Sequence, residues 1–257
     1  MSDELLVRRA DGVVEVTFHR PERRNAFTRE MYAALRDLCE ELHDSPQVRA
    51  LVLRGAGGRA FAAGNEIRDF VGADAVAYEQ WIGELLRSLF TLPQVTVAAV
   101  DGVCVGGGLA VAAHCDLRLA TPGSRFGYPI ARTLGNALAA PIVYRTAAVF
   151  GESLTREMLL ASRLVGADRA HAVGAVMVVT DDLDGELATL LEGLAHASGV
   201  TLRATKGQLL DRAQRLEVAP DGDEELLREV YTGPDFTEGV RAFLAKERPA
   251  FEGRAER

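Results

Sequence analysis

Residue types that build disulfide frameworks and metal sites are scarce in this chain of 257 residues. Its three cysteines, Cys39, Cys104 and Cys115, are odd in number and lack the paired spacing of a disulfide or zinc-binding motif. Its five histidines are scattered, and no two of them have the spacing of metal ligands. We therefore expect no disulfide bonds and no bound metal.

Positive charge is also scarce: 29 Lys and Arg residues stand against 37 Asp and Glu residues, so the formal net charge is −8. Such a chain lacks the clustered basic face that nucleic-acid binding requires. No apolar run reaches the roughly 18 residues of a membrane-spanning helix, and residues 1–9 lack the apolar stretch of a signal peptide. We expect a cytoplasmic protein with no nucleic-acid or membrane partner.

The glycine-rich motifs of nucleotide sites are missing as well. No glycine loop ends in the Gly-Lys-Ser/Thr of a P-loop, and no Gly-x-Ser-x-Gly nucleophile elbow occurs. Residues 102–108 follow a predicted strand and open a predicted helix, but their glycine spacing differs from that of a dinucleotide-binding loop. The sequence therefore predicts no permanently bound cofactor.

Hydrophobic residues make up 48% of the chain, enough for a sizeable core. Their periodicity predicts strands that alternate with helices, which is typical of an α/β fold. The predicted strands span 14–18, 50–53, 95–100, 117–120 and 176–179, and the predicted helices span 31–42, 78–89, 106–113, 202–216, 224–230 and 236–246. Thr28 is the expected N-cap of the first helix. We expect an α/β body over residues 1–195 and a helical region over residues 196–257.

Two glycine-containing loops, residues 61–67 and 105–109, lie where extended segments give way to helical ones. Glycine lets the backbone approach a ligand closely, and the first N–H groups of a helix have no partner within it. If the two loops converge, they offer two N–H donors to one developing oxyanion. The alternative is that both loops are tight turns that pack helices on strands.

Six segments, in order along the chain, form a recognisable set. They are Arg20–Phe27 with its Pro-x-x-x-Asn-Ala pattern, Phe61–Gly64, Ala99–Gly108, Cys115–Arg118, Phe126–Pro129 and Asp235–Arg248. Together they resemble the crotonase superfamily, also called the enoyl-CoA hydratase/isomerase family, over nearly the whole chain. The resemblance implies a ββα spiral with a helical C-terminal trimerisation region, assembled as a homotrimer or a dimer of trimers.

The family binds acyl-CoA thioesters and stabilises an enolate or similar anion at the thioester carbonyl. The resemblance therefore implies that coenzyme A arrives as part of the substrate. It also implies that the two oxyanion donors are the backbone N–H groups of Asn65 and Gly107. An enoyl-CoA hydratase-like lyase is the activity expected from the family as a whole.

The resemblance also places residues around the rest of the substrate. The adenosine and phosphate end of CoA is expected beside the loop that contains Arg23, Arg24 and Ala26. Phe243 and Lys246 are expected to contact CoA bound by a neighbouring subunit. The remaining residues expected near the thioester are Ala63, Ile67, Gly106, Pro129 and Ile130.

Two positions depart from the pattern of the hydratases in this family, which use two glutamates as base and acid. Ala110 and Ile130 stand at those positions, and neither side chain can carry a proton. Three readings remain open. Other polar side chains transfer the proton, or the reaction needs little proton transfer, as in a decarboxylation, or the protein binds acyl-CoA without catalysis. A CoA-thioester hydrolase is a further alternative within enzymes.

The candidates for a replacement acid or base follow from sequence position, and each has a structural alternative. Glu66 could instead support its loop, and Tyr128 and Arg132 could instead pack or make a subunit contact. His114 could be a packed histidine, and Asn136 is the expected N-cap of a helix that begins at Ala137. Arg132 could also pair with a substrate carboxylate through its two-pronged guanidinium.

Overall fold

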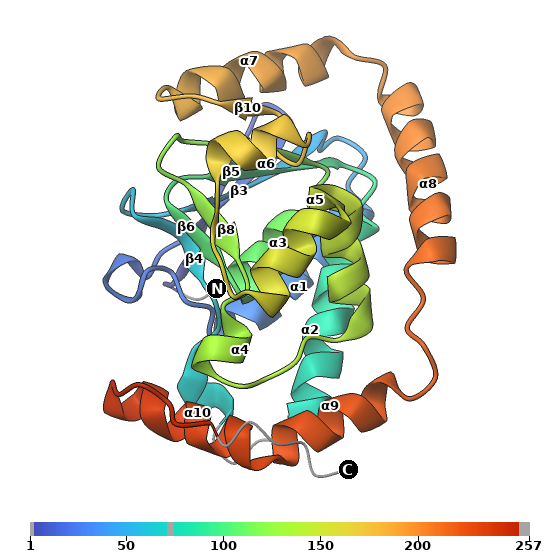
Figure 1. Cartoon of the computed structure of the whole chain (residues 1–257). Helices are drawn as coiled ribbons and strands as arrows, with labels where there is room; N and C mark the ends of the chain where they lie inside the picture. The colour runs from blue at the N-terminus through green and yellow to red at the C-terminus, as the bar shows by residue number, and fades with distance from the viewer. Residues whose placement is uncertain (1–2, 71–74, 252–257) are drawn as a thin grey trace.

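The computed structural model describes residues 3–70 and 75–251 (Figure 1). Within these residues the strands form a six-stranded sheet in the order β1-β2-β3-β5-β7-β10 and a four-stranded sheet in the order β4-β6-β8-β9. The strands of the larger sheet are β1 (Leu5–Ala10), β2 (Val13–Phe18), β3 (Ala50–Gly55), β5 (Val95–Val100), β7 (Leu117–Ala120) and β10 (Val178–Val179). Those of the smaller sheet are β4 (Ala60–Ala63), β6 (Val103–Val105), β8 (Arg125–Gly127) and β9 (Val165–Gly166).

The chain repeats one unit: a strand in the larger sheet, a strand in the smaller sheet, then a helix. β3 and β4 lead into α2 (Ala75–Phe90), and β5 and β6 lead into α3 (Gly107–His114). β7 and β8 lead into α4 (Ile130–Thr133) and α5 (Ala140–Leu160). The first unit differs, because β1 and β2 both lie in the larger sheet before α1 (Arg29–His43). This is the predicted α/β fold, a ββα spiral.

The predicted strands are found where continuous apolar runs lie at the centre of the larger sheet. β2, β3, β5 and β7 pair in parallel; β3 and β5 carry continuous apolar runs, as strands buried on both faces do, whereas β2 alternates. β1 was not predicted, because most of this edge strand is exposed and carries no alternating pattern. The strand predicted over 176–179 is shorter than expected and comprises only Val178–Val179.

The first helix begins as its sequence predicts. Thr28 Oγ1 accepts a hydrogen bond from Met31 N–H at 3.2 Å, the bond of an N-cap. Met31, Leu35 and Leu42 repeat at helical spacing and are buried against the larger sheet. The three cysteines are free and buried, Cys39 in α1, Cys104 in β6 and Cys115 after α3.

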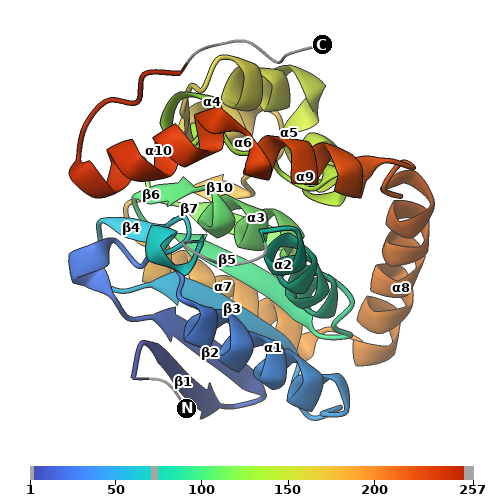
Figure 2. The same ribbon diagram turned by 90° about the horizontal axis from the view of Figure 1, so that it is seen from below.

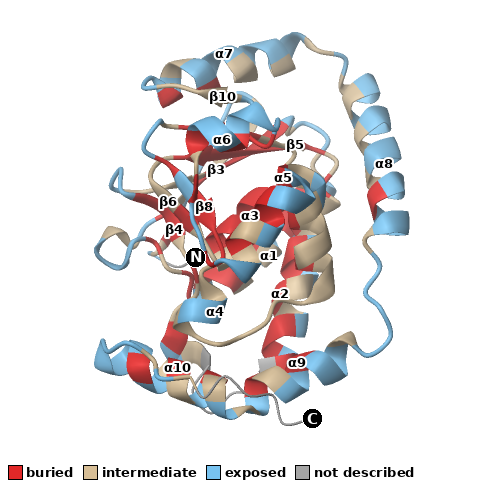
Figure 3. Ribbon diagram, viewed as in Figure 1, coloured by how far each residue is buried: buried red, intermediate tan, exposed pale blue. Residues whose placement is uncertain are grey.

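The C-terminal helices run around the outside of the body (Figures 1 and 2). They are α6 (Ala167–Ala172), α7 (Leu183–His196), α8 (Gly199–Leu216), α9 (Asp223–Thr232) and α10 (Pro234–Ala245), and two 3₁₀ turns, η1 (Pro21–Arg23) and η2 (Ile67–Phe70), lie in the body. The boundary predicted at 195/196 falls at the end of α7. α8 stands apart from the body and is largely exposed, with Val200 71% and Leu209 62% exposed (Figure 3).

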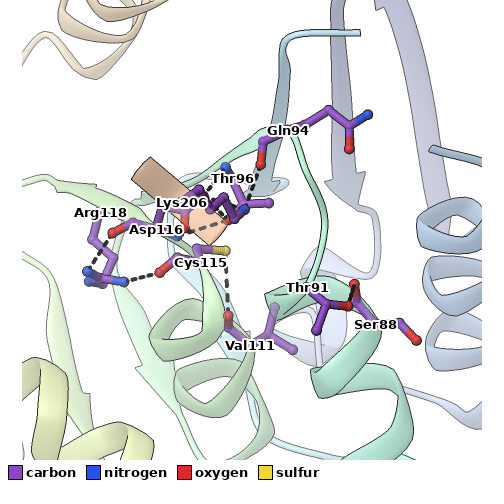
Figure 4. Close-up of polar contacts among 9 residues, drawn as sticks. All are labelled: Ser88, Thr91, Gln94, Thr96, Val111, Cys115, Asp116, Arg118 and Lys206. Carbon is purple, nitrogen blue, oxygen red and sulfur yellow. Dashed lines mark hydrogen bonds and ion pairs between the residues drawn. The ribbon is translucent and has the colours of Figure 1, made fainter. Parts of the chain in front are cut away.

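One lysine ties α8 to the larger sheet. Lys206 Nζ donates to Gln94 O at 2.6 Å and to Asp116 Oδ2 at 2.7 Å, and only 11% of its side chain is exposed (Figure 4). Asp116 Oδ2 also accepts from Thr96 N–H at 2.7 Å. Beside it, Arg118 is buried and donates to four backbone carbonyls. A partly buried, hydrogen-bonded ion pair thus helps to hold α8 against the body.

Candidate active site

The two glycine loops lie side by side because the strands that lead into them are paired. β4 and β6 are parallel neighbours, and their last paired residues are Ala63 and Val105. Gly64 and Gly106 follow directly, with φ of +95° and +55°, which side chains rarely allow. A Cβ atom on Gly106 would lie 3.2 Å from Gly64 Cα. Glycine at both positions therefore allows this close approach.

The next residue in each loop is one of the two expected donors. Gly107 is the first residue of α3, so its N–H has no acceptor within the helix. In the other loop, Phe27 N–H donates to Gly64 O at 2.8 Å, and Glu66 N–H donates to Phe27 O at 2.7 Å. Asn65 N–H lies between these two bonds and has no hydrogen-bond acceptor among the residues described. The two N–H groups are therefore close together and available to a ligand.

Tyr32 of α1 connects the two loops, and its role was not predicted. Its hydroxyl donates to Asn65 Oδ1 at 2.7 Å. A Cβ atom on Gly107 would collide with this hydroxyl and with Asn65 Oδ1, so the pair packs directly against Gly107. Tyr32 is 1% exposed, and burial raises its pKa, so the hydroxyl keeps its proton as the donor. Its neighbour Met31 belongs to the predicted apolar stripe, but nothing in the sequence pairs Tyr32 with Asn65.

The basic loop before α1 is held at the end of β4. Ala63 N–H donates to Arg24 O at 3.0 Å. Arg24 and Asn25 have left-handed backbones, and Asn25 is fully buried with its amide bonded to three backbone groups. Ala26 is half-buried, whereas the side chains of Arg23 and Arg24 are exposed. A rigid loop thus presents two cations near the glycine loops.

Glu66 is used within this loop structure. Its Oε2 lies 3.3 Å from Arg20 Nη2. The same guanidinium forms an ion pair with Glu4 at 2.9 Å and donates to Ala26 O at 2.7 Å. Glu66 therefore holds the arginine that lies beneath the basic loop, as its structural alternative predicts. Ile67, next in sequence, is 5% exposed and begins η2.

Tyr128 and Arg132 each form a hydrogen bond within the protein. Tyr128 is fully buried, and burial raises its pKa; its hydroxyl bonds with Thr146 Oγ1 at 3.1 Å. Arg132 is exposed and donates to Ser162 O at 3.2 Å. Pro129 and Ile130, between them in sequence, are half-buried at the start of α4.

The prediction for Asn136 is wrong, and that for His114 as a packed residue is right. α5 begins at Ala140, where Asp223 of α9 caps its N–H at 3.0 Å, and Asn136 instead donates to Tyr231 at 3.3 Å. His114 is 7% exposed, and its Nδ1 lies 2.7 Å from Ala110 O. Burial lowers the pKa of His114 to about 4, so the ring is neutral.

A large cavity lies between the body and the C-terminal helices. Its volume is about 970 Å³, and it is bounded by α2, the start of α5, α9 and the segment that joins α8 to α9. His114 lines it from α3. Ala110, four residues earlier, lies on the same face of α3 and is 2% exposed.

One acidic residue in the cavity wall was missed by sequence reasoning. Glu79 is 5% exposed and lies three residues before Ile82, within the apolar stripe of α2. An acidic residue on the apolar face of an amphipathic helix is the signal that could have found it. Burial raises the pKa of Glu79 to about 7.

Comparison with known proteins shows the family of this chain. The family model described as enoyl-CoA hydratase/isomerase matches residues 8–254. The chain belongs to the enoyl-CoA hydratase/isomerase family. A 2,3-dehydroadipyl-CoA hydratase of Escherichia coli is 31% identical over 98% of this chain and 99% of its own length. A 1,2-epoxyphenylacetyl-CoA isomerase of the same species is 29% identical over 99% and 100%.

A solved structure shows the same fold. A methylmalonyl-CoA decarboxylase in complex with 2-nitronate-propionyl-CoA superimposes with a TM-score of 0.89 over 99% of this chain and 100% of that one. At 22% identity this likeness concerns the fold alone. The relatives similar in sequence thus carry hydratase and isomerase names, and a protein of the same fold carries a decarboxylase name.

Two further properties concern residues 3–70 and 75–251. None of the helices there has the length and apolar character needed to span a membrane. No group of three or more His, Cys, Asp or Glu side chains is arranged there to hold a metal ion. Phe243, 52% exposed, and Lys246, at the end of α10, lie on the surface.

Proposed function

We propose that this protein binds an acyl-CoA thioester and stabilises its enolate with the backbone N–H groups of Asn65 and Gly107. The observation that carries the proposal is the convergence of two loops, each with an available N–H. When an enolate forms, negative charge moves to the thioester oxygen, and donors fixed beforehand stabilise it without reorganisation. One such donor contributes about 2.7–4 kcal/mol to the lowering of a barrier.

The proposed CoA site uses exposed cations of an otherwise acidic chain. Arg23 and Arg24 lie on the rigid loop beside β4 and would contact the phosphates. Phe243 and Lys246 would contact CoA on a neighbouring copy in a homotrimer or a dimer of trimers. The exposed apolar residues of α8 support assembly, since Val200 and Leu209 have no cover within the described chain.

The reaction is proposed to differ from hydration by two glutamates. Ala110 is buried where the hydratase pattern has its first glutamate, and Ile130 stands at the second position. We expect the rate of crotonyl-CoA hydration to be several orders of magnitude below that of a two-glutamate relative. Decarboxylation is the second candidate, because loss of carbon dioxide generates the enolate without a base.

A binding measurement and a turnover screen test this function. Butyryl-CoA binding is measured by calorimetry, and crotonyl-CoA, a malonyl-type thioester and a β-ketoacyl-CoA are screened for turnover. Thioester binding with turnover of one class supports the enzyme, and binding without turnover indicates a non-catalytic acyl-CoA-binding subunit. Absence of binding contradicts the proposal. Crotonyl-CoA hydration on the order of 10 per second would contradict the expected loss of hydratase activity.

A further inference from the structure

The cavity of about 970 Å³ has an acidic group in its wall that makes no ion pair. Glu79 of α2 is 5% exposed and has no cationic partner among the residues described. Its Oε1 accepts a hydrogen bond from Tyr231 of α9 at 2.5 Å. A buried carboxylate without a cation is costly, so this group is held near the balance between its charged and neutral forms.

The hydrogen bonds around Tyr231 suit both forms of Glu79. The tyrosine hydroxyl has one proton and two nearby acceptors, Glu79 Oε1 at 2.5 Å and Ala137 O at 3.1 Å, and Asn136 Nδ2 donates to it at 3.3 Å. With Glu79 ionised, the hydroxyl donates to the carboxylate. With Glu79 protonated, the carboxyl group donates to the hydroxyl, which then donates to Ala137 O. Gain and loss of a proton therefore require only a reversal of hydrogen bonds.

Several charged and titratable groups lie on the elements packed against Glu79, and burial is what favours its neutral form. They are Asp223, Glu224 and Tyr231 of α9, Arg29 and Tyr32 of α1, His114 of α3, and Tyr78 of α2 itself. Burial, followed by the charge of Asp223, raises the pKa of Glu79, and the hydrogen bond from Tyr231 lowers it, with a result of about 7. At neutral pH both protonation states are populated.

Glu79 lies on α2, the helix that packs against α1 with its Tyr32 and against α3, whose first residue is Gly107. Burial raises the pKa of Tyr32, and the charge of Glu79 adds to that rise, so the two groups interact through space. The Tyr32 hydroxyl in turn bonds Asn65 and packs against Gly107. Trp81 of α2 contacts the Tyr32 ring, with centroids 5.9 Å apart. α2 therefore brings Glu79 to the same part of the molecule as the donors.

Helix α3 also contributes to the cavity wall. Ala110 and His114 are four residues apart on that helix, and His114 lines the cavity. Asn65 and Gly107 do not themselves line the cavity, and His114, the last residue of α3, is the residue of that helix that does.

We propose that Glu79 is the group that removes a proton from the α carbon of the bound acyl-CoA, and that the cavity receives the acyl chain. This inference rests on the proposed function. In the step, the α C–H bond breaks and its proton passes to the Glu79 carboxylate. The electron pair becomes the enolate, whose oxygen is bound by Asn65 and Gly107 N–H. The reverse step returns a proton from Glu79 to the α carbon.

Exchange of α protons with solvent measures this step without knowledge of the physiological substrate. The protein is incubated with butyryl-CoA in D₂O, and deuterium at the α carbon is followed by mass spectrometry. We expect exchange with the unmodified protein and a rate at least about 100-fold lower in Glu79→Gln, which keeps the size and the contact with Tyr231. Glu186→Gln, an exposed change on α7, is the matched control and should exchange normally.

The pH dependence gives a second measurement on the unmodified chain. Exchange requires ionised Glu79, so its rate should rise with pH and level off above an apparent pKa of about 7. Tyr231→Phe removes the hydrogen bond that lowers this pKa, so the midpoint should move to higher pH. A structural role alone would not move the midpoint.

The outcomes separate this inference from the proposed function. If butyryl-CoA binds and exchange persists in Glu79→Gln, or if no exchange occurs with the unmodified protein, Glu79 is not the base although the binding function stands. If butyryl-CoA does not bind at all, the proposed function fails and the inference fails with it. An unfolded Glu79→Gln variant leaves the pH profile of the unmodified protein to decide.

Discussion

Backbone atoms form one side of the proposed site, whereas buried side chains form the other. The donors of Asn65 and Gly107 have no titratable atoms, and their positions are set by strand pairing and by glycine. On the other side, Glu79 of α2 and Tyr231 of α9, 152 positions apart in sequence, are held together by a hydrogen bond. The backbone donors should therefore be insensitive to pH and sensitive to any change of backbone shape. The Glu79–Tyr231 pair should be sensitive to pH and less sensitive to small changes of shape.

The largest expected effect is at the backbone side. Gly107→Pro removes the proposed N–H donor and forces a side chain against Asn65 and Tyr32. Turnover, or α-proton exchange, should fall by about two to three orders of magnitude. Gly193→Ala is the control, because it adds a Cβ to open space on α7 and should leave the rate unchanged. A folded Gly107→Pro variant with normal rates would remove Gly107 from the proposed site.

On the side-chain half, the expected effect is on stability. The pKa of Glu79 in the folded protein is about 7, above its ordinary value of 4.5. The free energy of unfolding therefore falls as pH rises from 4.5 to 7. Glu79→Gln should therefore raise the free energy of unfolding at pH 8 by about 3 kcal/mol, measured by urea denaturation. At pH 4 the two proteins should be equally stable.

His114 produces the opposite slope and allows a check of the sign. Its folded pKa of about 4 lies below 6.5, so the unfolded chain binds a proton that the folded chain does not, and stability falls as pH falls from 6.5 to 4. With Glu79 removed, its loss of stability above pH 4.5 should disappear, and the loss below pH 6.5 that comes from His114 should remain. The same pH dependence with and without Glu79 would contradict the neutral buried carboxyl group.

A smaller effect is expected where the two halves meet. Tyr32→Phe deletes the hydrogen bond to Asn65 but keeps the ring between α1 and α2. Because Tyr32 positions the donor without touching substrate, kcat should fall about tenfold while KM changes little. Tyr144→Phe, on α5, is the matched control. Equal kcat values for Tyr32→Phe and the unmodified protein would show that strand pairing alone positions Asn65.

The smallest effect is expected at the proposed CoA contacts, which belong to neither half. Arg24→Ala with Lys246→Ala should weaken butyryl-CoA binding about threefold to tenfold at low salt, and less at high salt, because the side chains are exposed. Arg156→Ala with Arg215→Ala removes two exposed cations elsewhere as a control. Equal affinity for both double variants would place the phosphate contacts elsewhere.

The same comparison explains what the sequence could predict. Strands 95–100 and 117–120, the cap at Thr28 and the two glycine loops are set by local pattern, and all were predicted. β1 was missed because an exposed edge strand needs no hydrophobic pattern. Asn136 was assigned to the wrong partner because Tyr231, 95 residues away, bonds it instead. Glu79 and Tyr32 gain their importance from contacts between distant helices, which no local pattern specifies.

The buried thiols have a practical use. Burial raises the pKa of Cys39 and Cys115 to about 12, and that of Cys104 is raised as well, so at neutral pH the folded chain presents no thiolate to an alkylating reagent. Labelling then requires local or global opening, and its rate reports the free energy of that opening. Cys104 in β6 and Cys115 after α3 flank Gly107 in sequence, whereas Cys39 lies in α1. Mass spectrometry of the three alkylated peptides would thus follow how ligands rigidify the region around the glycine loops, with no introduced probe.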